Sequence, residues 1–460
     1  MRKIVGPIIV LAVTLAMVAG LAASQRVVVV KSTTHGTAVR HALTMKGPDH
    51  YSFARYKAQN HLSSQMNQLI RRQQAGAAFH NCSGFLSIPC FNSWLITGYR
   101  NSVYSYSMVG HSPKAGGTTG IPNEVIPLEL FLIGPDGVTV IYDQDPGKPQ
   151  DLGLSDVDLL TQGPLYNATT TYPGGVGLPA DTGQFVDTTL RASFNGVKKA
   201  NWHTPLNPPT FPTVHYIGQL FFNNGDWACF GGETPPCTSF QVVNINAISN
   251  IFAQILGPSQ EDPPSTEVPI IVTDFVTAFA GSNCCILGFH NAQPGNEGGN
   301  SVLVWTWATY IAQSVSNPFD PFGFDTFVMS HEVSELYHDP FVQTTGTLIS
   351  PWIDGSVSFA QANLETGDAI EAMSDSASDF HVPLTTTGGP YTYHTQNEAL
   401  LQWFGRNPQA PQTGPGPGVY SWPDTNTLNN GHPCASQDFV VGEGPAGFFA
   451  DDGSTTGQCH

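Results

Sequence analysis

The segment FVMSHEVSELYH, residues 327–338, has the pattern of an amphipathic helix. His331 and Glu335 share one face, because successive residues rotate by about 100° along a helix, and His338 follows one turn later. A second face is apolar and carries Met329, Val333 and Leu336. We expect the helix to run from Asp325 to His338, since the Asp-Pro pair that follows cannot continue it. It should pack its apolar stripe into a core and direct its imidazole and carboxylate groups at a cleft.

Strand-like segments precede this helix. Residues 268–275 and 301–308 are rich in β-branched and aromatic side chains, which favours buried strands. Further candidates are 214–222, 285–290 and, as either strand or helix, 241–256. Strands that lead into one helix are typical of α/β and α+β domains. We predict an α+β fold, a mixed sheet with a central H-E-x-x-E helix, in a zincin-like α/β domain over residues 213–460 with a Pro/Gly-rich loop at 406–418.

The region before this domain has a different pattern. Residues 80–205 consist mainly of strand and turn signals and form a predicted β-rich region. Within it, residues 128–142 predict a hairpin that turns at Pro135-Asp136-Gly137. A proline-rich connector at 205–212 marks the main internal boundary. The β-rich region could be a separate module or a layer of the same fold.

Charge and composition limit the classes of function. The chain has 460 residues, with 17 Lys and Arg against 35 Asp and Glu, for a formal net charge of −18. Nucleic-acid binders and proteins that attach to membranes through basic patches need a positive face. Both classes are therefore disfavoured.

The N-terminus is typical of an exported protein. Residues 1–24 combine a basic start, an apolar stretch and small residues at the end, which is the pattern of a cleavable signal peptide. An uncleaved signal anchor is the alternative, but Gly6 and Pro7 shorten the apolar stretch. We expect a secreted protein, extracellular or periplasmic, with no membrane association after cleavage. Its first part should be an N-terminal helical arm over residues 25–79, with a helix at about 50–74.

Eight cysteines in an exported chain predict disulfide bonds. The simplest expectation is two local pairs, Cys82–Cys90 and Cys229–Cys237. Adjacent cysteines bond each other only in a strained ring. We therefore expect at least one of Cys284 and Cys285 to pair with Cys434 or Cys459.

The helix also predicts a metal site. Two side chains four residues apart on one helix face can hold a single ion, as they do in H-E-x-x-H helices. His331 and Glu335 are so placed, and a third ligand would come from Glu365 or Asp368 in the segment LETGD. One imidazole and two carboxylates suit zinc, manganese or iron. Glu332, beside His331, is the candidate base for a water molecule that the ion activates.

The pattern His331-Glu-x-x-Glu335 resembles the metal-binding helix of the zincin metallopeptidases. The residue after the first His is the catalytic base in that family, so the resemblance implies this role for Glu332. The chain departs from the family at Glu335, where zincins have a second His. The wider pattern, with LETGD at 364–368 and YTYH at 391–394, is similar to uncharacterised secreted proteins of bacteria and fungi. More loosely, it resembles the phosphate-induced (EXORDIUM-like) proteins of plant cell walls.

Each candidate residue also has a plainer interpretation. Glu332 and Glu335 fit a solvent-exposed acidic helix face. His394 could polarise a substrate carbonyl, or it could simply precede a helix that begins with the capping box TQNE, residues 395–398. His290, on a strand before the helix, fits a hydrogen-bonded core histidine.

We therefore expect a secreted metal-dependent hydrolase of peptidase type that acts on extracellular proteins or peptides. Its predicted metal ligands are His331, Glu335, Glu365 and Asp368, and its predicted catalytic groups are Glu332 and His394. The alternative is a non-catalytic secreted or cell-envelope binding protein with the same fold, whose carboxylates hold a structural ion or none. A glycosidase with paired carboxylates such as Glu332 and Asp368 is a third class, and it would need a carboxyl separation of about 5–9.5 Å.

Overall fold

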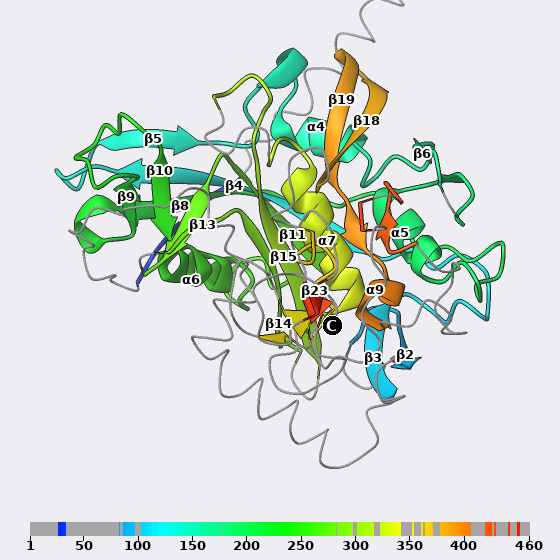
Figure 1. Cartoon of the computed structure of the whole chain (residues 1–460). Helices are drawn as coiled ribbons and strands as arrows, with labels where there is room; N and C mark the ends of the chain where they lie inside the picture. Colours follow the sequence, from blue (N-terminus) through cyan, green and yellow to red (C-terminus); the bar gives the residue numbers. More distant parts are fainter. Residues whose placement is uncertain are drawn as a thin grey trace, which may run out of the picture.

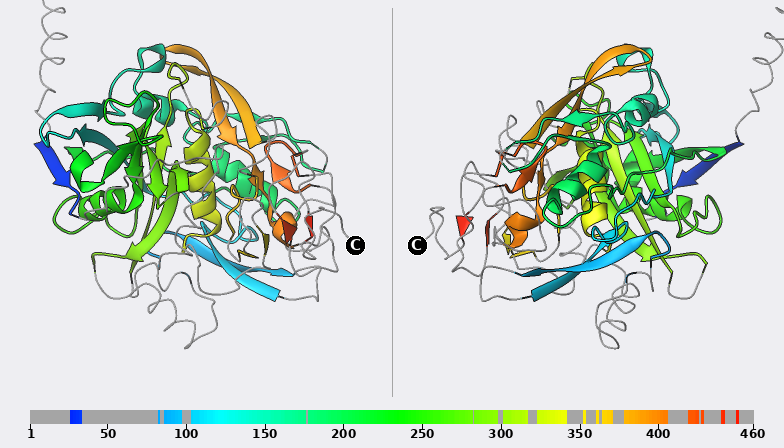
Figure 2. Two further views of the ribbon diagram at one scale, coloured as in Figure 1. Left: turned by 60° about the vertical axis from the view of Figure 1, so that its left-hand side comes forward. Right: turned by 90° about the vertical axis from the view of Figure 1, so that its right-hand side faces the viewer.

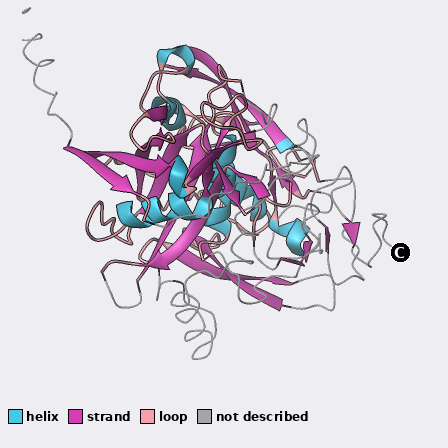
Figure 3. Ribbon diagram, turned by 90° about the vertical axis from the view of Figure 1, so that its left-hand side faces the viewer, coloured by secondary structure: helices cyan, strands magenta, loops and turns pink. Residues whose placement is uncertain are grey.

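Strands make up most of the regular structure (Figure 3). The structure is a computed structural model that describes residues 26–33, 82, 86–96, 103–175, 177–281, 283–297, 301–316, 323–341, 352–353, 360–361, 364–370, 378–405, 419–425, 427–428, 440–441 and 449–450. The expected signal peptide, the N-terminal helix at 50–74 and the loop at 406–418 lie outside these ranges.

The largest sheet has seven strands in the order β1-β8-β4-β11-β15-β14, with β5 paired to β4 (Figure 1). Its strands are β1 (Arg26–Lys31), β4 (Asn123–Ile133), β5 (Val140–Gln144), β8 (Val214–Phe221), β11 (Val268–Asp274), β14 (Gly288–Pro294) and β15 (Val302–Tyr310). Neighbours from β1 to β15 are parallel, whereas β14 and β5 pair antiparallel with β15 and β4. The β4–β5 pair confirms the hairpin predicted at 128–142.

β4 joins the two halves of the chain in one sheet. It comes from the region before the proline-rich connector, yet it lies between β8 and β11, which follow the connector. Residues 80–205 therefore contribute two strands, β4 and β5, to the same sheet. They also supply two helices, α4 (Asp156–Gln162) and α5 (Phe185–Ser193). Ser155 is the N-cap of α4, and its hydroxyl accepts a hydrogen bond from the Asp158 amide at 3.1 Å in a capping box.

Helices cover both faces of this sheet. β11 and β15 are buried along their whole length, as is typical of parallel strands with both faces covered. Ile270 and Val304 pack in the core that contains α5 and α7 (Phe327–His338). Ile271 and Trp305 point the other way, into the core around α6 (Ile245–Ile255). This mixed sheet with its few helices agrees with the predicted α+β class.

The remaining strands form smaller units. One four-stranded sheet comprises β9 (Trp227–Cys229), β10 (Gln241–Asn244), β12 (Thr277–Ala280) and β13 (Asn283–Ile286). A second comprises β16 (Trp352–Ile353), β17 (Ala360–Gln361), β22 (Val440–Val441) and β23 (Phe449–Ala450). Two-stranded pairs are β2 (Cys90–Ile96) with β3 (Val103–Val109), β6 (Thr171–Tyr172) with β7 (Asp181–Thr182), β18 (Asp379–Thr386) with β19 (Gly389–Gln396), and β20 (Glu398–Ala399) with β21 (Ser421–Trp422). Short helices are η2 (Asp151–Gly153), η3 (Phe222–Asn224) and α9 (Leu401–Gly405).

Two hairpins flank α7. The β18–β19 hairpin and the β2–β3 hairpin lie toward opposite ends of the helix (Figure 2), and both β19 and β3 contact it. α7 also packs on β14, β15 and α5. The helix is thus enclosed by elements from widely separated parts of the sequence.

The disulfides agree with the sequence in part. The two local pairs, Cys82–Cys90 and Cys229–Cys237, are present as predicted. Cys284 is joined directly to Cys285, so the predicted pairing of one of them with Cys434 or Cys459 is wrong. Both residues belong to one small buried apolar cluster. Cys434 and Cys459 lie outside the described ranges.

Candidate metal centre

α7 is buried along its whole length, so the alternative of a solvent-exposed acidic face is wrong. The helix starts at Phe327 and not at Asp325, because Asp325 has a positive φ of 39° that a right-handed helix does not include. The polar residues His331, Glu332 and Glu335 are, as whole residues, 7%, 6% and 2% exposed. They face other polar groups inside the protein.

The segment 364–370 meets the helix at Glu335. The backbone amides of Gly367 and Asp368 both donate to Glu335 Oε1, at 3.0 Å each. The second oxygen, Oε2, is left to face two imidazoles. Residue 367 must be glycine for this approach, since a Cβ there would lie 2.7 Å from Cγ and 2.8 Å from Cε1 of the His331 ring.

Three of the predicted ligands form a first donor trio. His331 Nε2 lies 3.1 Å from Glu335 Oε2 and 3.5 Å from Asp368 Oδ1, and the three donor atoms are all within 4.8 Å of one another. Ligand atoms about 2.1 Å from one tetrahedral zinc ion are about 3.4 Å apart, so this spacing fits a shared ion. His338 takes no part in it. Its Nδ1 donates to the Ser334 carbonyl at 2.8 Å, and burial lowers its pKa to about 4.

Gln396 fixes the orientation of the His331 ring. The side-chain amide nitrogen of Gln396 donates to the Gly367 carbonyl at 2.8 Å, so its oxygen faces His331 Nδ1, also at 2.8 Å. Nδ1 must then carry the hydrogen that it donates to this oxygen. The lone pair of the neutral ring is therefore on Nε2, the atom that faces Glu335 and Asp368.

A second donor trio lies beside the first. His290, on β14, places Nδ1 3.4 Å from Glu332 Oε2 and 3.6 Å from Glu335 Oε2. Glu335 Oε2 thus belongs to both trios. Glu365, a predicted ligand, faces the other nitrogen of the His290 ring, with Oε2 3.8 Å from Nε2. This places Glu365 behind His290 and outside both trios.

The pKa values of His331 and Glu398 are both raised, for different reasons. Burial alone would lower the pKa of His331, but the carboxylates of Glu335, Glu332 and Asp368 raise it well above its ordinary value. Burial is also the main cause that raises the pKa of Glu398 well above its usual range, with Glu335 acting in the same direction. The negative charges that stabilise a proton on His331 would also stabilise a metal ion bound to His331 in place of that proton.

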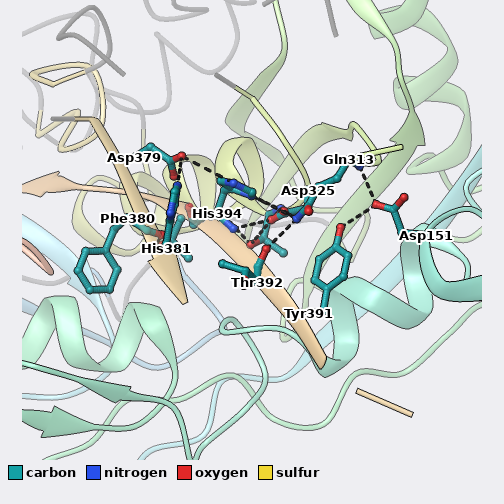
Figure 4. A network of polar contacts seen from close by, with 12 residues as sticks. Asp151, Gln313, Asp325, Asp379, Phe380, His381, Tyr391, Thr392 and His394 are labelled. Carbon is teal, nitrogen blue, oxygen red and sulfur yellow. Dashed lines mark hydrogen bonds and ion pairs between the residues drawn. The ribbon is translucent and has the colours of Figure 1, made fainter. Parts of the chain in front are cut away.

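His394 does not join this cluster. Its Nδ1 lies 2.6 Å from Asp325 Oδ2, in a separate polar network shown in Figure 4. The capping box predicted at 395–398 is wrong, because Thr395 is part of β19 and its hydroxyl donates to the Phe380 carbonyl at 3.3 Å. The helix that follows begins only at Leu401.

His290 and Gln396 belong to the centre although neither was predicted there. His290 is two residues after Gly288 on β14. A Cβ on residue 288 would lie 2.9 Å from Glu332 Cγ. A glycine and a histidine alternating on a strand that precedes a polar helix would have been a usable signal. Gln396 has no comparable signal, because it reaches His331 through the pairing of a distant hairpin.

The arrangement can bind a divalent cation through imidazole nitrogen and carboxylate oxygen, at a place enclosed by α7, β14 and the segment 364–370. None of the helices in the described part of the chain has the length and apolar character needed to cross a bilayer. No protein-family model matches the chain, and no curated protein or solved structure matches it either.

Proposed function

We propose that this protein is an exported metal-dependent hydrolase of peptidase type. The observation that carries the proposal is the first donor trio. His331 Nε2 lies 3.1 and 3.5 Å from carboxylate oxygens of Glu335 and Asp368, close to the spacing of about 3.4 Å between ligands of one zinc ion. The hydrogen bond that His331 donates to Gln396 and those that Glu335 accepts from the 367–368 amides hold two of these three side chains in place.

His331, Glu335 and Asp368 would hold the ion. One imidazole nitrogen and two carboxylate oxygens suit zinc, with manganese and iron as harder alternatives. Such an ion, when bound, lowers the pKa of a water molecule toward 7 and polarises a carbonyl group. Three protein ligands are the number found in catalytic zinc sites, which keep a further position for water or substrate.

Glu332 would act as the general base. Its Oε1 lies 3.9 Å from His331 Nε2, and its Oε2 lies 3.4 Å from His290 Nδ1. His290 can therefore hold Oε2 while Oε1 is directed at the first trio. In this role Glu332 accepts a proton from the attacking water and returns it to the leaving amine. The resemblance to zincins supports the same role for the residue after the first His.

Extracellular proteins or peptides are the proposed substrates. Two local disulfides are typical of chains that fold in oxidising compartments. The basic and apolar pattern of residues 1–24 supports export into such a compartment. The peptidase reaction itself rests on the H-E-x-x-E resemblance together with the metal-competent trio.

Two isosteric variants, Glu332→Gln and Glu335→Gln, distinguish the role of general base from that of metal ligand. Purified protein loaded with Zn²⁺ is assayed on casein and on a mixed peptide library, and its metal content is measured. Glu332→Gln should keep the metal and lose about 100-fold or more of the hydrolysis rate. Glu335→Gln should lose both, whereas Glu398→Gln, a buried glutamate outside both trios, should lose neither.

Two outcomes would contradict the proposal. Stoichiometric metal without hydrolysis of any substrate would reject the hydrolase and favour a structural ion in a binding protein. Absence of stoichiometric metal, even after Zn²⁺ is added, would reject the metal centre as well.

A further inference from the structure

The β18–β19 hairpin carries a second group of metal-ligand side chains. We propose that Asp379, His381 and His394 form a separate site for a divalent transition-metal ion, with zinc as the reference ion. His381 Nε2 lies 3.0 Å from Asp379 Oδ2, and His394 Nε2 lies 3.9 Å from the same oxygen (Figure 4). The three donor atoms all lie within 4.8 Å of one another.

Strand register brings these side chains together. His381 and His394 are direct partners across the antiparallel β18–β19 pair. Asp379 precedes His381 by two residues, so it lies on the same face of the hairpin. The two imidazole rings meet edge to face, with centroids 4.8 Å apart. The hairpin thus presents two imidazoles and one carboxylate on one face.

A buried carboxylate orients His394 for this role. Asp325 Oδ2 lies 2.6 Å from His394 Nδ1, and Asp325 is fully buried. A carboxylate in that position takes the hydrogen of Nδ1 and leaves the lone pair on Nε2, the nitrogen that faces Asp379. Metal-binding histidines commonly have such a carboxylate on the nitrogen that does not bind the ion.

Asp325 is itself held in place from several sides. Its Oδ1 accepts the backbone amide of His394 at 2.9 Å, and its Oδ2 accepts the side-chain amide of Gln313 at 2.7 Å. The backbone amide of Gln313 in turn donates to Asp151 Oδ2 at 2.6 Å, which also accepts the Tyr391 hydroxyl at 2.8 Å. Figure 4 shows this row of contacts leading from Asp379 to Asp151. The orientation of His394 is therefore determined before any ion binds.

The site differs from the buried centre in its access to solvent. The side chain of His381 is 64% exposed, whereas those of His331 and Glu335 are 9% and 3% exposed. None of the three hairpin residues belongs to either buried trio. Two histidines and one carboxylate at an accessible surface leave positions open, so the ion should exchange with the medium and bind water or small anions.

Metal stoichiometry tests the proposal. Zn²⁺ binding to the purified protein is measured by titration calorimetry and by elemental analysis after dialysis. His381→Ala removes an exposed ligand and should abolish one equivalent of Zn²⁺, or weaken its binding by about 100-fold. Asp325→Asn should weaken the same equivalent by about 10–100-fold through His394. The loss should persist when Glu335→Gln has already removed the buried centre, so the two sites are tested independently.

A matched control is His203→Ala. His203 is 33% exposed and pairs with a carboxylate, Asp187, at 2.7 Å, but its second nitrogen faces the guanidinium of Arg191 at 3.4 Å. This variant should bind Zn²⁺ like the wild type. Equal Zn²⁺ number and affinity in His381→Ala and wild type would overturn the proposal. The Co²⁺ complexes of the Glu335→Gln variant and of the Glu335→Gln, His381→Ala double variant are also compared by visible spectroscopy. Identical spectra would overturn the proposal as well.

Discussion

Replacement of Glu335 by glutamine should preserve the structure of the proposed metal centre but weaken its binding of metal. Glu335 Oε1 accepts two backbone amides, from Gly367 and Asp368, at 3.0 Å each. The oxygen of a glutamine side chain can accept the same two bonds. Its amino group then replaces Oε2 and points a donor at His331 Nε2 and His290 Nδ1. The segment 364–370 should therefore stay in place while the shared ligand atom is lost.

The size of the effect follows from the number of ligands. Structural zinc sites with four ligands bind with about 10–16 kcal/mol, or about 3 kcal/mol for each ligand. Loss of one ligand should thus weaken Zn²⁺ binding by about 100-fold. At a Zn²⁺ concentration 100 times the wild-type Kd, the ion stabilises the wild type by about 2.7 kcal/mol. The Glu335→Gln variant would gain only about 0.4 kcal/mol under the same conditions.

The assay is urea unfolding with and without Zn²⁺, together with competition against a chromophoric chelator. Glu398→Gln is the matched control, because Glu398 is a fully buried glutamate that belongs to neither donor trio. Glu335→Gln should lose about 2 kcal/mol of the Zn²⁺-dependent stabilisation while the control keeps it. Equal Zn²⁺ affinity in Glu335→Gln and wild type would refute the assignment of Glu335 as a ligand.

Two further variants test how the surroundings support the centre, and a third tests how stability depends on pH. Gly367→Ala should displace the His331 ring and weaken Zn²⁺ binding by about tenfold or more in chelator competition; unchanged affinity would show that the ring position is not critical. Gln396→Leu removes the partners of the His331 ring and the Gly367 carbonyl, so it should cost about 1–3 kcal/mol in urea unfolding and weaken Zn²⁺ binding by about 10–100-fold. A loss of stability without any loss of affinity would argue against its orienting role. Burial and the nearby Asp274 carboxylate raise the pKa of Asp156 to about 9, so its contribution to stability is complete below pH 4 and is lost as the pH rises toward 9. Asp156→Asn should remove that dependence, of up to about 1.4 kcal/mol per pH unit, from urea unfolding between pH 5 and 8; an unchanged slope would contradict it.

Local sequence patterns correctly predicted two central strands and the polar face of α7. The composition of residues 268–275 and 301–308 predicted two strands that are present as β11 and β15. The helical spacing of His331 and Glu335 placed both side chains on one face, and the LETGD segment does meet that face. These predictions succeed because the helical period and the β-branched and aromatic composition of strands can be recognised within short segments.

Long-range pairing accounts for what the sequence did not predict. His290 reaches the centre because β14 pairs with β15 in a register that local composition does not specify. His394 was predicted as a catalytic group of the buried centre, but in the β18–β19 pair it lies opposite His381 and faces Asp325. Thr395 and the residues after it have the spacing of a capping box, but pairing with β18 takes Thr395 into a strand. In each case a tertiary contact overrides a local signal.

The contact between α7 and the segment 364–370 explains why residue 335 is a glutamate here, whereas the zincin pattern has a histidine. A carboxylate has two oxygens, so one accepts the amides of Gly367 and Asp368 while the other faces the imidazoles. A neutral histidine has a single acceptor nitrogen. If that nitrogen bound an ion, the two buried amides would lack an acceptor, at a cost of about 1–3 kcal/mol each. Glu335 thus ties the ligand-bearing segment to the helix through the same side chain that would bind the ion. Because of this double use, we expect formation of the proposed metal centre to be coupled to folding of the segment that supplies Asp368.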